Sequence, residues 1–79
     1  MIATYYTESG SVYRFTEDAF GQTQCQREGE RPCLYKAVDL LSEPRVGQPL
    51  KFYGVLWDEE AKVLIRLTRS TNVMWMETA

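Results

Sequence analysis

The chain has 79 residues, which fits a single small domain over residues 1–79 that removes only about 60% of its unfolded surface from water on folding. With 44% hydrophobic and 25% charged residues, the composition is that of a folded globular protein and excludes disorder throughout. The net charge of −2 argues against a dedicated non-specific nucleic-acid binder, because such proteins neutralise phosphates with basic side chains. A core this small gives modest stability, so a homodimer is an alternative to the monomer.

The N-terminal region carries a hairpin signal. β-Branched and aromatic residues crowd both sides of a Ser-Gly turn at 9–10, which predicts strands over 2–7 and 12–16. A two-residue loop pairs Tyr6 with Tyr13 on the face that we expect to be buried. A four-residue loop is the alternative, because Ser-Gly is a weaker turn dipeptide than Asn-Gly.

The middle of the chain gives weaker patterns. Residues 22–27 are polar without an apolar period and read as either an exposed edge strand or an irregular loop. A short strand is expected over 33–35, behind a proline that is tolerated at a strand start. Residues 36–41 are either a helix of barely two turns or an extended piece in which Val38 and Leu40 point inward.

The strongest pattern is a hairpin after the Pro- and Gly-rich connection at 42–49. Apolar residues alternate along both arms around a polar turn at 58–61, for which we expect a two- or four-residue loop. The pairs predicted on its core face are Leu56 with Val63, Gly54 with Ile65, and Phe52 with Leu67. Burial of this face is expected to set the register. Residues 70–72 then interrupt the second arm as a turn or a bulge, and the strand resumes over 73–77.

In this register the outer face of the hairpin is basic and aromatic and has no carboxylate. Its candidate ligand- or partner-binding residues are Lys51, Tyr53, Trp57, Lys62 and Arg66. Aromatic rings can stack on a base while the cations meet a phosphate or an acidic side chain, which predicts a nucleotide, another acidic ligand or an acidic protein surface as partner. The alternative is that the two rings pack beneath another element, with the Lys and Arg stems covering their rims.

The sequence offers little catalytic chemistry. It contains no histidine, which removes Ser-His-Asp and Cys-His machinery and the commonest metal ligand. No Gly-rich phosphate loop is present. Acidic pairs at 17–18 and 58–60 fall in predicted turns, where carboxylates are usually solvated. We therefore expect no enzyme, no catalytic residue, no cofactor and no metal site.

Cys25 and Cys33 are the two cysteines of the chain. A three-residue loop over 28–30 would place them directly opposite each other, which permits a cross-strand disulfide. Two reduced thiols are the alternative that a cytosolic setting favours, and they are our prediction. A zinc site would need ligands from two chains.

Membrane and targeting signals are not found. No run approaches the about 18 apolar residues of a membrane span, and the N-terminus lacks a positive region followed by an apolar signal core. We expect a cytoplasmic protein, in a host cytosol, with no membrane partner.

Three motifs resemble a group of short uncharacterised bacteriophage and prophage proteins. They are the Ser-Gly-Ser-x-Tyr hairpin at 9–13, the Val-Gly-x-Pro-Leu strand start at 46–50 and the Thr-rich terminal strand at 68–77. The resemblance implies a phage or mobile-element setting, in which very short acidic proteins often inhibit a host process, anti-CRISPR and other anti-defence proteins included. It carries over no functional residues.

These patterns predict an all-β, or β-rich α+β, domain: a small antiparallel sheet or partly open SH3-like roll of five to six strands with at most one short helix. The expected core residues are Ile2, Tyr6, Tyr13, Phe15, Leu34, Val38, Leu50, Phe52, Leu56, Val63, Ile65, Leu67, and Val73 or Trp75. Three functions follow: a binding protein that inhibits or modulates a host protein or protein complex, a small-ligand or nucleotide-binding protein, and a virion structural or assembly component.

Overall fold

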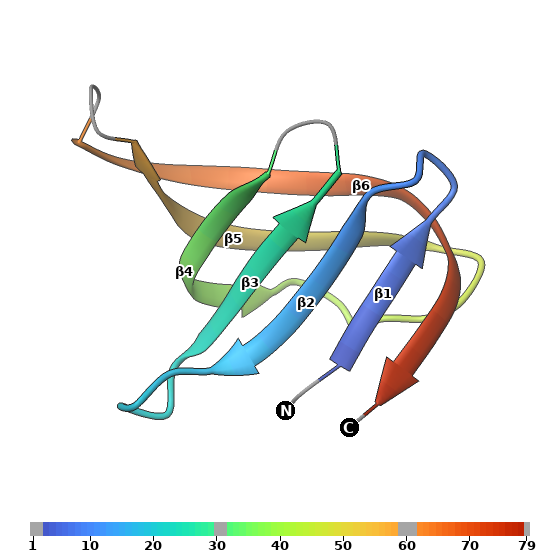
Figure 1. Ribbon diagram of the computed structural model, residues 1–79, viewed down its shortest axis with the longest axis horizontal. Coiled ribbons are helices and arrows are strands. Elements are labelled where there is room, and N and C mark those ends of the chain that lie inside the picture. Colours follow the sequence, from blue (N-terminus) through green and yellow to red (C-terminus); the bar gives the residue numbers. More distant parts are fainter. Residues whose placement is uncertain (1–2, 30–31, 59–61, 79) are drawn as a thin grey trace.

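The computed structural model describes residues 3–29, 32–58 and 62–78, with side chains described over 3–29, 32–56 and 66–78. The strands within these ranges are β1 (Ala3–Thr7), β2 (Val12–Glu17), β3 (Thr23–Glu28), β4 (Cys33–Leu40), β5 (Pro49–Asp58) and β6 (Lys62–Thr78). Each strand pairs antiparallel with the next, and β6 pairs with β1, so these six strands close into a barrel (Figure 1). The predicted all-β class is confirmed, and the described residues contain no helix.

β6 closes the barrel because it is long enough to pair with two neighbouring strands. Its first part pairs with β5 and its last part with β1, and Figure 1 shows it crossing behind the other strands before it turns down beside β1. The register shifts where the partners change, and at this bend the buried Ser70 hydroxyl accepts a 2.9 Å hydrogen bond from the backbone N–H of Leu50. The interruption predicted at 70–72 is therefore a bulge inside a continuous strand.

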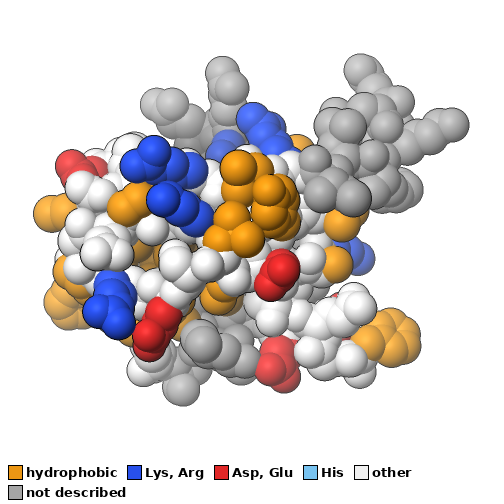
Figure 2. Space-filling view, turned by 180° about the vertical axis from the view of Figure 1, so that it is seen from behind, with side chains coloured by type: hydrophobic (Ala, Val, Ile, Leu, Met, Phe, Trp, Pro, Cys, Tyr) orange, Lys and Arg blue, Asp and Glu red, His pale blue; other side chains and the backbone are white. Residues whose placement is uncertain are grey.

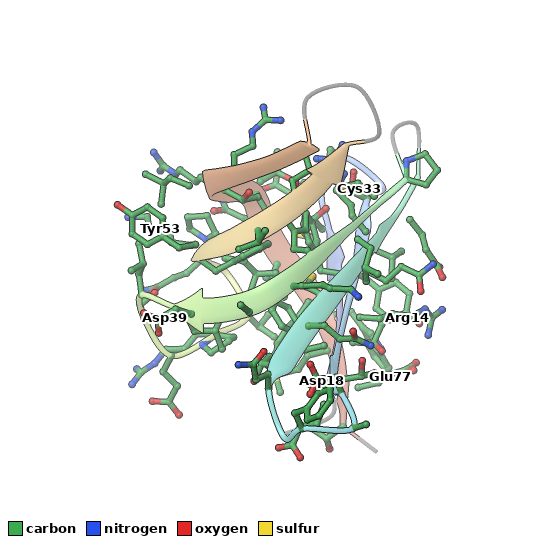
Figure 3. The ribbon with its side chains drawn as sticks, turned by 90° about the vertical axis from the view of Figure 1, so that its left-hand side faces the viewer. Arg14, Asp18, Cys33, Asp39, Tyr53 and Glu77 are labelled. Carbon is green, nitrogen blue, oxygen red and sulfur yellow. The ribbon has the colours of Figure 1, made fainter. Side chains whose placement is uncertain are left out.

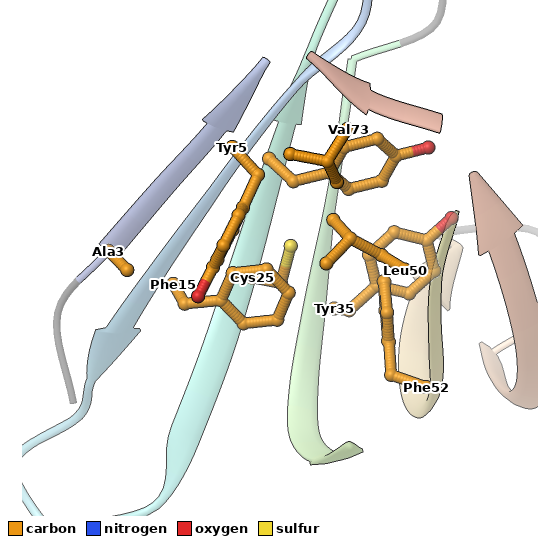
Figure 4. Packing of buried hydrophobic residues seen from close by; sticks show 9 residues of the cluster. Ala3, Tyr5, Phe15, Cys25, Tyr35, Leu50, Phe52 and Val73 are labelled. Atoms are coloured by element: carbon orange, nitrogen blue, oxygen red, sulfur yellow. The ribbon is translucent and has the colours of Figure 1, made fainter. Parts of the chain in front are cut away.

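The core is built around aromatic rings. Phe52 is fully buried, and its ring meets those of Tyr13, Phe15 and Tyr35 edge to face at centroid distances of 6.2, 5.6 and 5.2 Å. This geometry places the positive edge of one ring against the negative face of the next. Figure 4 shows the buried cluster, which comprises Ala3, Tyr5, Tyr13, Phe15, Cys25, Tyr35, Leu50, Phe52 and Val73.

The register of the first hairpin differs from the predicted one. Tyr13 pairs with Tyr5, so Tyr5 is buried and Tyr6 lies on the outer side of β1. The reason is the loop: the N–H of Thr7 donates to the Ser11 carbonyl and the N–H of Gly10 donates to the Thr7 carbonyl, which leaves three residues between Thr7 and Ser11. Gly10 adopts φ 87°, as a three-residue loop requires. A loop with an odd number of residues shifts the pairing by one residue relative to a loop of two or four, and this shift exchanges the buried and exposed sides of one strand.

The β5–β6 register is also shifted by one residue, so the three predicted pairs are wrong. Phe52 pairs with Thr68, Gly54 with Arg66, and Tyr53 with Leu67. Leu67, expected in the core, is 54% exposed. The expectations for Ile2, Val63 and Ile65 concern side chains outside the described residues.

The middle of the chain forms two strands of the barrel. β3 lies inside the sheet between β2 and β4, so the expectation of an edge strand or a loop over 22–27 is wrong. β4 is extended where a short helix was one prediction, and Val38 and Leu40 pack against the core as the extended alternative required. In the same strand Tyr35 is buried, whereas Leu34, a predicted core residue, is 38% exposed.

At the other end of the chain, β6 resolves the choice between two core candidates. Val73 is fully buried and Trp75 is 59% exposed. Val73 also donates its backbone N–H to the Gln48 carbonyl at 2.9 Å, which ties the bend of β6 to the connection before β5.

Candidate functional site

The structure keeps two of the five predicted binding residues together and separates a third from them. Lys51 and Tyr53 are exposed on the same side of β5. Arg66 is exposed as well, but it pairs with the buried Gly54 and thus lies on the opposite side of the sheet. The side chains of Trp57 and Lys62 lie outside the described residues. The prediction that Arg66 joins Tyr53 is therefore wrong, because it rested on the register that is shifted by one.

Another set of residues completes this surface. Tyr53 has Leu67 as its cross-strand neighbour on β6, and Lys51 has Arg69. We call the basic–apolar face the outer side of β4, β5 and β6 together with the residue after β4: Lys36, Asp39, Leu41, Lys51, Tyr53, Val55, Leu67 and Arg69. Figure 2, seen from the side opposite to Figure 1, shows hydrophobic side chains gathered beside Lys and Arg side chains.

A β-bulge in β4 brings one carboxylate onto this face. Lys36 pairs with Val55 and Asp39 with Tyr53, so two residues of β4 oppose one of β5, and Ala37 adopts φ 50° at the bulge. The extra residue changes the phase of the strand, which turns Val38 inward and Asp39 outward. Figure 3 shows Asp39 and Tyr53 on the same side of the molecule. The described hairpin residues of this face include no carboxylate, as expected, and β4 adds one.

The charge of the basic–apolar face remains positive. Lys36, Lys51 and Arg69 contribute three cations against the single carboxylate of Asp39. Between them, Tyr53 is 43% exposed and Leu67 54% exposed, and no described element covers either side chain. An exposed aromatic and aliphatic pair within a charged rim is typical of a surface that another macromolecule covers.

The acidic pair at 17–18 has a structural role at the β2–β3 turn. Oδ1 of Asp18 accepts hydrogen bonds from the backbone N–H groups of Phe20 at 2.8 Å and Gln22 at 2.9 Å. A carboxylate that satisfies turn amides in this way stabilises the loop. The acidic pair at 58–60 lies outside the described side chains. Among the described residues, no three His, Cys, Asp or Glu side chains group closely enough to hold a metal ion.

The two cysteines are free thiols on neighbouring strands. Cys25 pairs with Tyr35, and Cys33 with Arg27, so the thiols are diagonal neighbours, and the expectation that they lie directly opposite is wrong. Cys25 is fully buried in the core, whereas Cys33 is partly exposed. Burial, with a smaller contribution from the nearby Cys33, raises the pKa of Cys25 to about 12.

Alkylation should distinguish the two thiols. Without reductant, we expect intact mass to show two adducts after denaturation, because both cysteines are free. In the native protein Cys33 should react first, since the buried Cys25 reaches the reagent and ionises only when the fold opens. Time-resolved mass spectrometry measures both steps. A denatured protein that takes up no adduct would show that the thiols form a disulfide.

Stability should fall in alkaline solution. Burial raises the pKa of Cys25 from 9.0 to about 12 and raises the pKa values of Tyr5, Tyr13 and Tyr35 above 10.0. Between pH 9 and about 12 the unfolded chain therefore binds fewer protons than the folded one, and the free energy of unfolding decreases as pH rises. This stabilisation is fully present below pH 9. Urea titrations across this range measure it, and Cys25→Ala should make the decline near pH 9 shallower.

Neither a pocket nor a membrane-spanning helix is found in the described part of the chain. Comparisons with protein-family models, with curated proteins and with solved structures gave no match to this chain.

Proposed function

We propose that this chain is a small binding domain that inhibits or modulates a host protein complex, as proteins of phages and other mobile elements do, anti-CRISPR and other anti-defence proteins included. It acts in the host cytosol and binds through the basic–apolar face. The observation that supports this proposal is the exposed cross-strand pair of Tyr53 and Leu67 with Lys51 and Arg69 next to it. The phage setting rests on the three sequence motifs.

The composition of the face defines the partner's chemistry. Tyr and Arg carry a large share of the energy of protein interfaces, because a ring buries much area with few rotamers and a guanidinium binds carboxylates in a bidentate way. The apolar pair would sit at the centre of the contact, and the cations at its rim. The partner therefore presents an acidic surface around a small apolar spot, and charge complementarity speeds its association.

A nucleotide or another small acidic ligand is the second candidate function. It is favoured by the position of Tyr53 two residues from Lys51 on the same side of β5, an arrangement of ring and cation that suits a base and its phosphate.

Reversing the charge of the basic–apolar face should abolish binding. With Lys51→Glu and Arg69→Glu, like charges against an acidic partner cost several kcal/mol, which corresponds to a loss of affinity of at least about 100-fold. The fold should survive, since exposed substitutions change stability by about 0.5 kcal/mol. The measurement is affinity capture from host lysate with the wild-type protein and the double variant in parallel. Mass spectrometry identifies the partner, and titration then gives its affinity for each protein.

The matched control is Arg45→Glu with Arg66→Glu, which changes the net charge equally at exposed positions outside this face. It should keep the partner. A double reversal at Lys51 and Arg69 that keeps the partner at the wild-type level would place the binding surface elsewhere. A retained nucleotide would favour the second candidate function, and self-assembly would favour a structural component.

A further inference from the structure

A second surface lies where β6 pairs with β1. Tyr6 and Trp75 are cross-strand neighbours there, and Glu77 stands two residues beyond Trp75 on the same side of the strand. We call these three residues the aromatic–acidic face. Figure 3 shows Glu77 on the side of the molecule opposite Tyr53 and Asp39, so this face is separate from the basic–apolar face.

Hydrogen bonds hold the three side chains together. Nε1 of Trp75 donates to Oε1 of Glu77 at 3.2 Å, and Oη of Tyr6 donates to Oε2 of the same carboxylate at 3.5 Å. Each carboxylate oxygen thus accepts one bond from an aromatic side chain. Because a carboxylate offers about four acceptor positions, two remain for a donor from outside. Trp75 is 59% exposed, so its ring is available to the same donor.

The neighbouring charges leave this carboxylate open to a cation. Arg14 reaches the same side across Thr4, but its Nε donates to Oε1 of Glu28 at 3.1 Å. Arg14 therefore forms its ion pair with Glu28, whose hydrogen bond and charge raise the pKa of Arg14 most, while the charge of Glu77 raises it least. No direct ion pair to Glu77 is found among the described residues. Glu28 and Glu77 carry two negative charges against the one positive charge of Arg14, so these three described side chains together are net acidic.

We infer that the aromatic–acidic face recognises a basic side chain, a lysine or arginine, of a partner protein. A cation is attracted to the face of an aromatic ring, most strongly to that of tryptophan, and to a carboxylate through charge-assisted hydrogen bonds. Trp75, Tyr6 and Glu77 present both attractions at one place, already oriented by their own hydrogen bonds. This preference is opposite to that of the basic–apolar face and does not depend on the proposed function.

In the test, the protein is titrated with N-acetyl-arginine amide and with N-acetyl-lysine amide. Binding is monitored through the NMR signal of the Trp75 indole N–H. The chain has two tryptophans, and Trp57→Phe leaves Trp75 as the single indole reporter. We expect a saturable shift with both probes at low salt and none with N-acetyl-glutamine amide. A shift that fails to saturate with either basic probe, or that the neutral amide reproduces, would overturn the inference.

Variants separate recognition from folding. Glu77→Gln keeps the shape of the side chain and one of its two acceptor oxygens and removes its charge, so it should weaken probe binding about threefold to fivefold, the effect of losing an exposed charge pair. The matched control, Glu43→Gln, removes a carboxylate whose side chain is 81% exposed elsewhere and should leave binding unchanged. Equal effects of the two variants would overturn the site. Lys51→Glu with Arg69→Glu should not weaken probe binding, which keeps this test independent of the first one.

Discussion

Replacing Phe52 with alanine should lower the free energy of unfolding by about 3 to 5 kcal/mol. Phe52 is fully buried, and three aromatic rings pack against it edge to face. Truncation removes these contacts together and leaves a cavity that rings anchored on two other strands, β2 and β4, cannot fill. Since small domains have only about 5 to 15 kcal/mol of stability in total, the variant should be largely unfolded at moderate urea concentrations.

Equilibrium unfolding in urea, followed by near-ultraviolet circular dichroism, measures this effect. The control is Tyr53→Ala, one residue further along β5, whose side chain points to the opposite side and is 43% exposed. It should change stability by about 0.5 kcal/mol. Similar losses for Phe52→Ala and Tyr53→Ala would contradict the assignment of the two faces of β5.

Replacing Gly54 with valine should cost about 2 to 3 kcal/mol, at the upper end for overpacking. A Cβ atom at position 54 would lie 2.9 Å from Cβ of Tyr35 and 3.2 Å from its Cδ1. Both Cβ atoms are fixed by their backbones, and Tyr35 is buried, so the clash can be relieved only by moving β4 and β5 apart. Gly54 is therefore required by the close approach of these strands.

A double-mutant cycle tests this cause. Combined with Tyr35→Ala, Gly54→Val should cost less than it does alone, because loss of the ring removes the contacts at Cγ and Cδ1 and leaves room for the added methyl groups. The contact between the two Cβ atoms stays, so only part of the cost should be recovered. The free energies of unfolding of the four proteins, obtained in urea, give the coupling. Strictly additive losses would show that the ring of Tyr35 is not part of the obstacle.

The sequence predicted both hairpins, the first from β-branched and aromatic residues around a Ser-Gly turn and the second from the alternation of apolar residues, but it did not predict their registers. In each case a loop of two or four residues was expected, and both lengths give the same pairing. The structure has three residues between Thr7 and Ser11, and Asp58 pairs with Lys62 across three residues. Since side chains alternate with a period of two, a loop that is odd instead of even exchanges the buried and exposed sides of one strand.

The residues that make up the candidate surfaces depended on this difference in loop length. Tyr53 and Lys51 were predicted to share a face, and they do, because both lie on one strand with even spacing. Their neighbours come from β4 and β6, so Leu67, Arg69 and Asp39 could be assigned only once register and the bulge at Ala37 were known. The sequence pattern indicated Trp75 only as an alternative core residue.

The sequence by itself determined the all-β class, the separation of strands by Gly- and Pro-rich turns, and the burial of Tyr13, Phe15, Leu50 and Phe52, because these follow from local propensity and from alternation along one strand. The tertiary structure decided the rest. The polar stretch over 22–27 became an inner strand with Cys25 in the core because β2 and β4 pair with both of its edges, and the barrel closed because β6 bends at Ser70 to reach β1. Such pairings depend on residues far apart in the chain, and no local pattern encodes them.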